Sequence, residues 1–215
     1  MNEYVKNALI FTILIPAVVG MIRYNHVNKI YRFFIWYIWL GALNEIISLV
    51  TSYYFRSNAF NTNVFTLLDA LLVIRIFYEW KLFRSAKWIP LWLSGALIIG
   101  WIIDNFITGN IKEFNSWFPV IYSFILTIMS IVMLNKLFFG EKRKLLTNPM
   151  FLVCIGMIIG YTYIQFIELF WRYSMNNNLS IDIYDLYLYV NLLTYIIYTY
   201  AILCMNRKLP YTQLS

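Results

Sequence analysis

Seven apolar runs alternate with short polar segments along the chain. Each run is long enough to cross a bilayer as a helix, which takes about 20 mostly apolar residues. The runs cover residues 5–22, 33–55, 63–80, 88–107, 116–139, 149–172 and 183–205. Because only helices and closed barrels satisfy their backbone polar groups in lipid, the pattern predicts an all-α fold. We expect one seven-helix transmembrane domain over residues 1–215.

The polar segments between these runs alternate in their content of lysine and arginine. Cytoplasmic loops of membrane proteins carry an excess of these two residues. The segments after the first, third, fifth and seventh runs hold most of them: Arg23, Lys29, Arg32, Lys81, Arg84, Lys87, Lys136, Lys142, Arg143, Lys144, Arg207 and Lys208. The other side holds Lys6, Arg56, Lys112 and Arg172. This asymmetry predicts an N-terminus outside and a C-terminus in the cytoplasm.

The third run contains three charged residues, Asp69, Arg75 and Glu79. A charge near the middle of a membrane-spanning helix costs at least a few kcal/mol unless it faces protein or water. We therefore expect all three side chains to point into the protein interior. Arg75 and Glu79 lie one helical turn apart, so they are predicted to form an ion pair.

Polar residues in several other runs fall at a depth similar to that of Asp69. At a rise of 1.5 Å per residue, Glu45 lies about 14 Å and Asp69 about 10 Å below the predicted outer surface. We expect these two carboxylates to form the floor of a cavity that opens outward and to share a proton. The candidate ligand-binding residues are Asn44, Glu45, Asp69, Asp104, Tyr161, Gln165, Glu168 and Asn191.

Helix packing without any ligand is the alternative interpretation of the other polar positions. Ser123, Thr127 and Ser130 repeat at helical spacing, and Gly156 and Gly160 form a GxxxG motif. Small and hydroxyl residues at such spacing bring membrane helices into close contact. For the two deep carboxylates we favour a functional role, because ionisable groups at membrane depth mark functional sites.

Composition supports membrane residence. The chain is 61% hydrophobic and 13% charged, whereas soluble domains are about 25% charged. The net charge of +7 is divided among short clusters between apolar runs, which indicates topology rather than binding of nucleic acid.

Cys154 and Cys204 lie near predicted cytoplasmic helix ends, so we expect free thiols. The first run lacks a clear signal-peptide cleavage site and is expected to be a retained helix.

The sequence excludes several kinds of catalytic site. The one histidine, His26, lies in a loop, so a bis-histidine haem or a three-histidine zinc site within the membrane lacks its ligands. The last run has no lysine to anchor retinal, and the chain has neither a G-x-S-x-G motif nor a glycine-rich phosphate loop. We therefore predict no metal and no cofactor. Acid and base catalysis by Glu45 and Asp69 remains open.

Three short segments carry a resemblance to known proteins. They are ALNEIISLV at 42–50, the start of the third run from Asn63 to Asp69, and the stretch from PMF at 149–151 to GY at 160–161. They resemble a poorly characterised family of bacterial seven-helix integral membrane proteins related to the membrane sensor portions of histidine kinases. Asp69 stands where that family is expected to have glutamate. The resemblance implies a stand-alone sensing or scaffolding module that signals through a partner.

The leading hypothesis is a receptor-like or sensory membrane module whose outward polar cavity binds a small ligand or a proton. The alternatives are a small transporter, a carboxylate-dependent enzyme acting on lipids, and a structural subunit of a membrane complex. Enzymatic activity is left open, with a non-enzymatic role favoured. The expected partners are membrane lipids at the basic loops and a cytoplasmic or membrane protein, without nucleic acid; a homo-oligomer remains open. The expected location is the cell inner (plasma) membrane.

Overall fold

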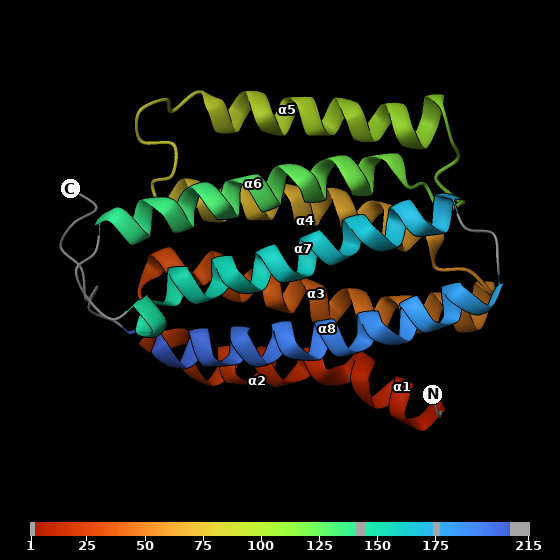
Figure 1. Ribbon diagram of the computed structural model, residues 1–215, viewed down its shortest axis with the longest axis horizontal. Helices are drawn as coiled ribbons and strands as arrows, with labels where there is room; N and C mark the ends of the chain where they lie inside the picture. The colour runs from red at the N-terminus through yellow and green to blue at the C-terminus, as the bar shows by residue number, and fades with distance from the viewer. Residues whose placement is uncertain (1–2, 141–144, 174–176, 207–215) are drawn as a thin grey trace.

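The computed structural model describes residues 3–140, 145–173 and 177–206, and these residues fold into helices joined by short turns (Figure 1). The elements in chain order are α1 (Glu3–Ile10), η1 (Phe11–Ile13), α2 (Leu14–Arg23), η2 (Tyr24–His26), α3 (Lys29–Phe55), α4 (Ala59–Glu79), α5 (Ile89–Ile102), η3 (Ile103–Ile107), α6 (Trp117–Gly140), η4 (Leu145–Thr147), α7 (Pro149–Tyr173) and α8 (Asn177–Cys204). Within the described residues, seven helices are long and apolar enough to cross a membrane. The predicted all-α, multi-pass fold is confirmed.

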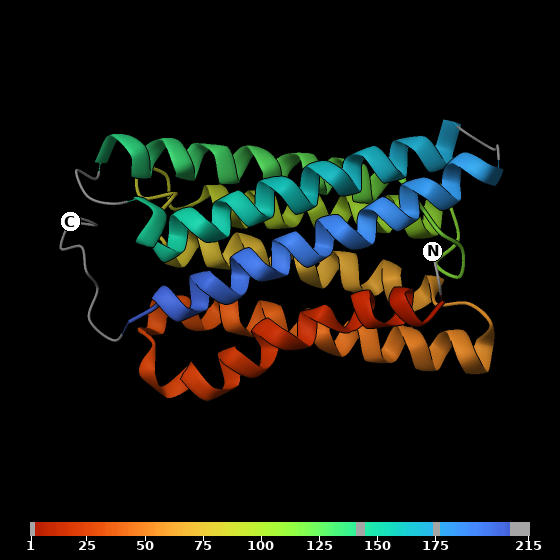
Figure 2. The ribbon, with the colours of Figure 1, turned by 60° about the horizontal axis from the view of Figure 1, so that its bottom comes forward.

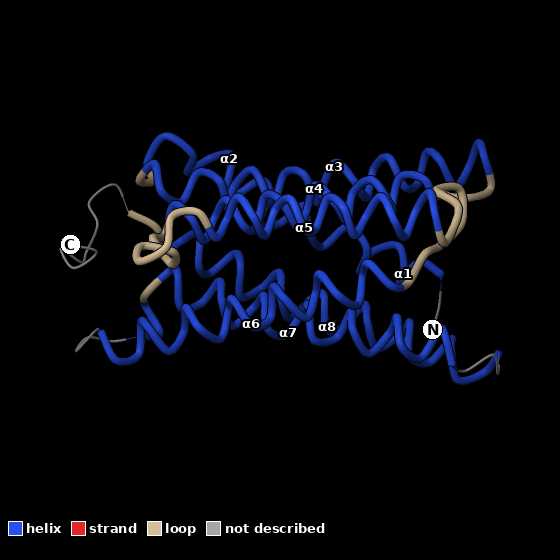
Figure 3. Tube along the Cα trace, turned by 90° about the horizontal axis from the view of Figure 1, so that it is seen from above, coloured by secondary structure: helices blue, strands red, loops and turns tan. Residues whose placement is uncertain are grey.

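The long helices form two layers that run along the longest axis of the molecule. Seen from above, α2, α3, α4 and α5 lie in one layer and α6, α7 and α8 in the other (Figure 3). Contacts between α2 and α8 join the layers on one side, and contacts between α4 and α6 join them near the other. Figure 2 shows α8 crossing beside α2 and α3. Helix α5 lies at the edge of the bundle, against α4 and α6.

Local sequence signals explain where several helices begin. The Asn28 side chain accepts a hydrogen bond of 3.2 Å from the Ile30 amide at the start of α3. Asn148 does the same for the Met150 amide at 2.9 Å, with Pro149 in the first position of α7. Asparagine caps and first-turn prolines are favourable because they satisfy or remove unpaired amides. Helix α3 therefore begins before the apolar run predicted from residue 33.

The first predicted helix, 5–22, is interrupted in the structure. A 3₁₀ turn, η1, separates α1 from α2 just before Pro16. Proline has no amide hydrogen, so Pro16 leaves the Thr12 carbonyl without its helical donor. The backbone tightens at this point, and the first membrane span consists of two helical pieces rather than one.

The described lysines and arginines of the connecting segments separate between the two ends of the bundle. We call the end where α2, α4, α6 and α8 finish the basic end; its described cations are Arg23, Lys29, Arg32, Lys81, Arg84, Lys87 and Lys136. Lys6, Arg56 and Lys112 lie toward the opposite end. Lys142, Arg143, Lys144, Arg207 and Lys208 lie outside the described residues. Which end faces the cytoplasm stays a prediction.

Buried polar and buried apolar side chains occupy different parts of the bundle. Most buried polar residues lie between the middle and the opposite end: Ser48, Asn63, Thr66, Asp69, Asp104, Asn105, Ser123 and Thr194. Apart from Leu126, the largest fully buried apolar side chains extend from the middle to the basic end: Tyr31, Phe34, Ile35, Ile38, Ile76, Phe77, Trp80, Met133, Met157, Ile202 and Met205. The core toward the basic end is thus an apolar plug, and the polar interior lies on its other side.

Candidate functional site

Asp69 is the buried carboxylate at the centre of the polar interior. It lies in the middle of α4 and is 4% exposed. The hydroxyl of Tyr161, on α7, donates a hydrogen bond of 2.9 Å to its Oδ2 atom. A buried carboxyl group in a membrane-spanning helix is costly unless such partners satisfy it. This bond therefore fixes Asp69 toward the second layer of the bundle.

Four tyrosines from four helices are linked to this carboxylate through hydrogen bonds and ring contacts. We call them the tyrosine cluster: Tyr37 of α3, Tyr122 of α6, Tyr161 of α7 and Tyr198 of α8. The Tyr122 and Tyr161 ring centroids lie 6.1 Å apart in an edge-to-face arrangement. The Tyr37 and Tyr198 centroids lie 6.3 Å apart in the same arrangement. Including Asp69, five membrane helices meet at this point.

The hydrogen bonds at Asp69 form a short chain. The Tyr161 and Tyr37 hydroxyl oxygens are 3.4 Å apart. A hydroxyl has one proton to donate, so while Tyr161 donates to an ionised Asp69 it accepts the Tyr37 proton. When Asp69 carries a proton on Oδ2, that group can donate to Tyr161, which then donates to Tyr37. A proton on Oδ2 of Asp69 can therefore reverse the direction of a hydrogen-bond chain that joins α4, α7 and α3.

A polar stripe on α7 leads from Asp69 toward the opposite end of the bundle. Tyr161, Gln165 and Glu168 share one face of that helix. Gln165 donates a hydrogen bond of 3.1 Å to the Thr127 hydroxyl on α6. Glu168 is partly exposed and lies within electrostatic range of Asp104. Along this face of α7, Tyr161 is buried beside the carboxylate, whereas Gln165 and Glu168 are partly exposed.

Asp104 has a structural contact at the start of α6. Its Oδ2 atom accepts a hydrogen bond of 3.0 Å from the Phe118 amide. Residues 103–107 form a π-helical segment at the end of α5, and this segment buries both Asp104 and Asn105. The carboxylate satisfies an amide that the start of a helix leaves unpaired. Asp104 joins α5 to α6 at the opposite end of the bundle.

The structure does not bring Glu45 into direct contact with Asp69. In the described part of the chain, no hydrogen bond links the two carboxyl groups, although both lie within electrostatic range of Tyr195 on α8. Its neighbour Asn44 accepts a hydrogen bond of 2.8 Å from Asn61 of α4. Asn191 is half-buried on α8. The candidate site is therefore centred on Asp69, and a directly bonded carboxyl pair does not form its floor.

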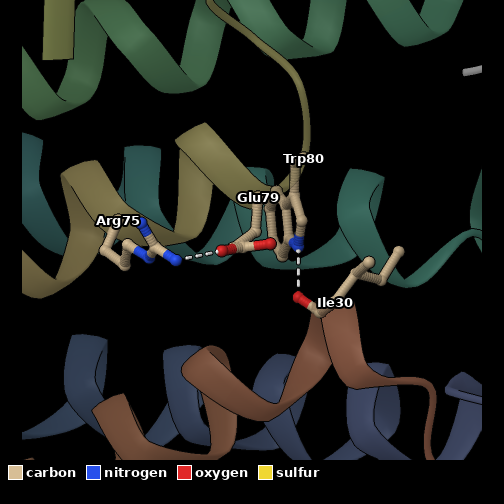
Figure 4. Close-up of polar contacts among 4 residues, drawn as sticks. All are labelled: Ile30, Arg75, Glu79 and Trp80. Carbon is tan, nitrogen blue, oxygen red and sulfur yellow. Dashed lines mark hydrogen bonds and ion pairs between the residues drawn. The ribbon is translucent and has the colours of Figure 1, made fainter.

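The predicted ion pair between Arg75 and Glu79 is confirmed (Figure 4). The exposure of the Arg75 side chain shows that it does not point inward. Half of the Arg75 side chain, 50%, is exposed, and its guanidinium lies 5.0 Å from the centre of the Phe33 ring. Arg75 lies about 6 Å from the end of α4, counted at 1.5 Å per residue. A long side chain can reach the interface from that depth. The expectation that all three charged residues of this helix face the interior is wrong for Arg75.

The packing interpretation of the remaining polar positions agrees with their contacts. The Ser123, Thr127 and Ser130 hydroxyls donate to carbonyls four residues earlier in α6, at 2.6, 2.8 and 2.8 Å. Gly156 lies against the Tyr198 ring, with no room for a Cβ atom, and Gly160 lies beside Thr194. The GxxxG motif thus brings α7 close to α8. The expected free thiols, Cys154 and Cys204, are also confirmed.

Sequence reasoning missed Tyr37 and Tyr122. Tyr37 lies seven residues before Asn44, so it shares a helix face with that predicted site residue and could have been included on that ground. Tyr122 belongs to the buried face of α6 that also carries Leu126 and Met129. Nothing in its apolar surroundings distinguishes it from an aromatic core residue.

Comparison with known proteins gave no relative for this chain: no family model, curated protein or solved structure matches it. Among the described residues, no three histidine, cysteine, aspartate or glutamate side chains are grouped so that they could hold a metal ion. The chemistry of the site therefore follows from its own residues, a buried carboxyl group and phenolic hydroxyls. Such groups bind and release protons and form hydrogen bonds with small polar ligands.

Proposed function

We propose that this protein is a receptor-like sensory membrane module whose responding group is Asp69. In this proposal Asp69 binds a proton, or a small hydrogen-bonding ligand, that arrives from the opposite end of the bundle. The observation that carries the proposal is the hydrogen bond from Tyr161 to a carboxylate that is 4% exposed. An ionisable group held in this way inside a membrane span is a functional-site candidate by default.

The hydrogen-bond chain supplies the two states that a sensor requires. A signal can shift a protein between two conformations only if it interacts differently with each of them. A proton on Oδ2 of Asp69 would reverse the donor and acceptor roles of Tyr161 and Tyr37, which belong to α7 and α3 and are joined to Asp69 by the observed contacts. The contacts between these helices and α4 would then differ between the two protonation states.

The apolar plug supports a sensor over a transporter. Beyond Asp69, α4 continues toward the basic end with Val73, Ile74 and Phe77, all at most 2% exposed. Met133 and Met157 are fully buried at the same end. A transported proton or solute would need polar groups or water along this half of the bundle. The arrangement suits a signal that ends at Asp69 and is relayed by helix movement.

A sensory role also agrees with the resemblance noted in the sequence. Three short segments resemble seven-helix proteins that are related to the membrane sensor portions of histidine kinases. On this proposal the protein lies in the bacterial inner membrane and signals through a cytoplasmic or membrane protein. The basic end would also contact anionic lipid headgroups, which attract clusters of lysine and arginine.

Steps in pH test the proposal on purified protein in lipid nanodiscs, with paired spin labels on α3 and α7 reporting the distance between the helices. We expect the wild type to change this distance with pH and Asp69→Asn to remain in one state. Glu45→Gln is the matched control, because it removes a second carboxyl group that is not hydrogen-bonded to Asp69, and it should keep the response.

Proton flux separates a sensor from a transporter. Vesicles that contain the wild type should show no proton flux. A flux that disappears in Asp69→Asn would support a transporter instead.

A further inference from the structure

A groove of about 250 Å³ lies on the outside of the bundle between α8 and the first helices. One side of it is a single stripe along α8: Leu192, Tyr195, Ile196, Thr199, Tyr200 and Leu203. These residues follow one another at helical spacing and so share one face. From Leu192 to Leu203 the stripe extends about 16 Å at 1.5 Å per residue. The groove is therefore long and narrow.

The other side of the groove lies at the break in the first membrane span. Thr12 belongs to the 3₁₀ turn η1, and Ile15 belongs to the first turn of α2. Both η1 and α2 pack against α8. The groove thus occurs where Pro16 interrupts the regular helix that would otherwise run alongside α8.

The walls of the groove are apolar and open toward the outside of the bundle. Ile15, Ile196 and Leu203 are 52%, 55% and 48% exposed. The Thr12 and Thr199 hydroxyls donate to carbonyls of their own helical segments, at 2.6 and 2.7 Å. The threonines therefore present mainly methyl groups. In a membrane-spanning segment this surface faces lipid, where no water is present to fill a groove.

The end of the groove near Leu203 leads to positive charge. Two residues further along, the Met205 carbonyl accepts a hydrogen bond of 2.9 Å from Arg23. Met205 follows Cys204, the last residue of α8, so this carbonyl lies just past the end of the helix. Lys29 and Arg32 belong to the same end of the bundle. Negatively charged lipid headgroups are attracted to such clusters at the membrane surface.

We propose that the groove binds an acyl chain of an anionic phospholipid from the surrounding bilayer. The chain lies along α8 from Leu203 toward Leu192, and the headgroup phosphate lies at the basic end near Arg23. The long shape, the apolar walls and the position of the positive charge at one end together fit this ligand. The proposal concerns a surface separate from the hydrogen bond at the proton site, because Asp69 and Tyr161 do not line the groove.

Photocrosslinking in vesicles tests this proposal. The probe is phosphatidylglycerol with a diazirine in one acyl chain, added in trace amounts to vesicles of phosphatidylcholine and phosphatidylglycerol that contain the protein. We expect crosslinks to concentrate on peptides covering residues 12–15 and 192–203. Helix α5 provides the reference for ordinary lipid contact, because Leu91 and Trp92 are 76% and 71% exposed.

Two tryptophan variants on α8 form a matched pair. Ile196→Trp fills the groove, and Leu193→Trp places the same ring on a residue of similar exposure, 49%, that does not line the groove. Both positions are exposed, so neither substitution disturbs the core. Ile196→Trp should lose the crosslinks at the groove peptides, and Leu193→Trp should retain them. Crosslinks spread as evenly as on α5, or equal losses in both variants, would overturn the proposal.

The headgroup is tested with a phosphatidylcholine probe that carries the same diazirine chain. We expect the phosphatidylglycerol probe to give the higher yield at the groove peptides and the two probes to give equal yields on α5. Equal yields at the groove would overturn the assignment of an anionic lipid.

Discussion

The Tyr161 hydroxyl donates a hydrogen bond of 2.9 Å to Asp69, and this bond joins α7 to α4 across 92 residues of sequence. It lies where the polar half of the interior meets the apolar plug. A change in the proton of this one carboxyl group alters a contact between the two layers of the bundle (Figure 3).

Removing the Tyr161 hydroxyl should destabilise the protein more than removing another buried phenol hydroxyl. Tyr161→Phe leaves Asp69 without this donor, and an unsatisfied buried polar group costs about 1–3 kcal/mol. Tyr122→Phe is the matched control, because Tyr122 is also 3% exposed but makes a ring contact with Tyr161 rather than a hydrogen bond to Asp69. Unfolding in detergent measures the loss of stability in each of the two variants. Equal losses of stability would mean that the bond to Asp69 has no special role.

The two glycines of the GxxxG motif should differ in their tolerance of alanine. A Cβ atom at position 156 would overlap the Tyr198 ring, whereas at position 160 it would make ordinary contacts with Thr194 at 3.8 and 3.9 Å. Overpacking of this kind costs about 1–3 kcal/mol, so Gly156→Ala should be destabilised. Gly160→Ala should unfold like the wild type under the same conditions. The reverse order would contradict the observed packing of α7 on α8.

The ion pair on α4 should contribute little to stability. Arg75 is half exposed, and exposed pairs four residues apart on a helix are worth about 0.3–0.5 kcal/mol. A double-mutant cycle of Arg75→Gln and Glu79→Gln, followed by unfolding in detergent, gives the coupling energy. A value of several kcal/mol would show that Arg75 is surrounded by protein in the membrane, as it would be in a homo-oligomer that covers this face.

Cysteine labelling tests the predicted orientation. We expect Lys112→Cys to react with a membrane-impermeant maleimide in intact cells and Ser85→Cys to react only after permeabilisation, since cations concentrate at the end that contains Ser85. Both positions are exposed turns at opposite ends of the bundle. The native thiols interfere little, because Cys154 is buried and Cys204 partly so. The opposite labelling pattern would reverse the orientation.

The sequence predicted the helices well because membrane spans depend on simple chemistry. A run of about 20 apolar residues has few alternatives to a helix in lipid. Errors occurred where single residues act through the backbone. Pro16 breaks the first span, and Asn28 begins α3 before its apolar run. Such effects need the positions of individual hydrogen bonds rather than average hydropathy.

The candidate site was only partly predictable. Membrane depth identified Asp69, and Tyr161 was among the predicted ligand-binding residues. Depth alone also suggested that Glu45 lies beside Asp69, because it gives no information on the rotation of one helix against another. Arg75 was expected inside because the cost of a buried charge was considered without the reach of its side chain toward the interface.

If Asp69 is the responding group, its protonation state changes as the protein responds. Infrared difference spectroscopy on wild-type protein in nanodiscs, taken between two pH values, detects this change as the C=O stretch of a carboxylic acid. The account predicts a band that is absent from Asp69→Asn, present in Glu45→Gln and shifted in Tyr161→Phe, because Tyr161 is bonded to that carboxyl group. A spectrum in which Asp69→Asn keeps every carboxylic acid band of the wild type would contradict it.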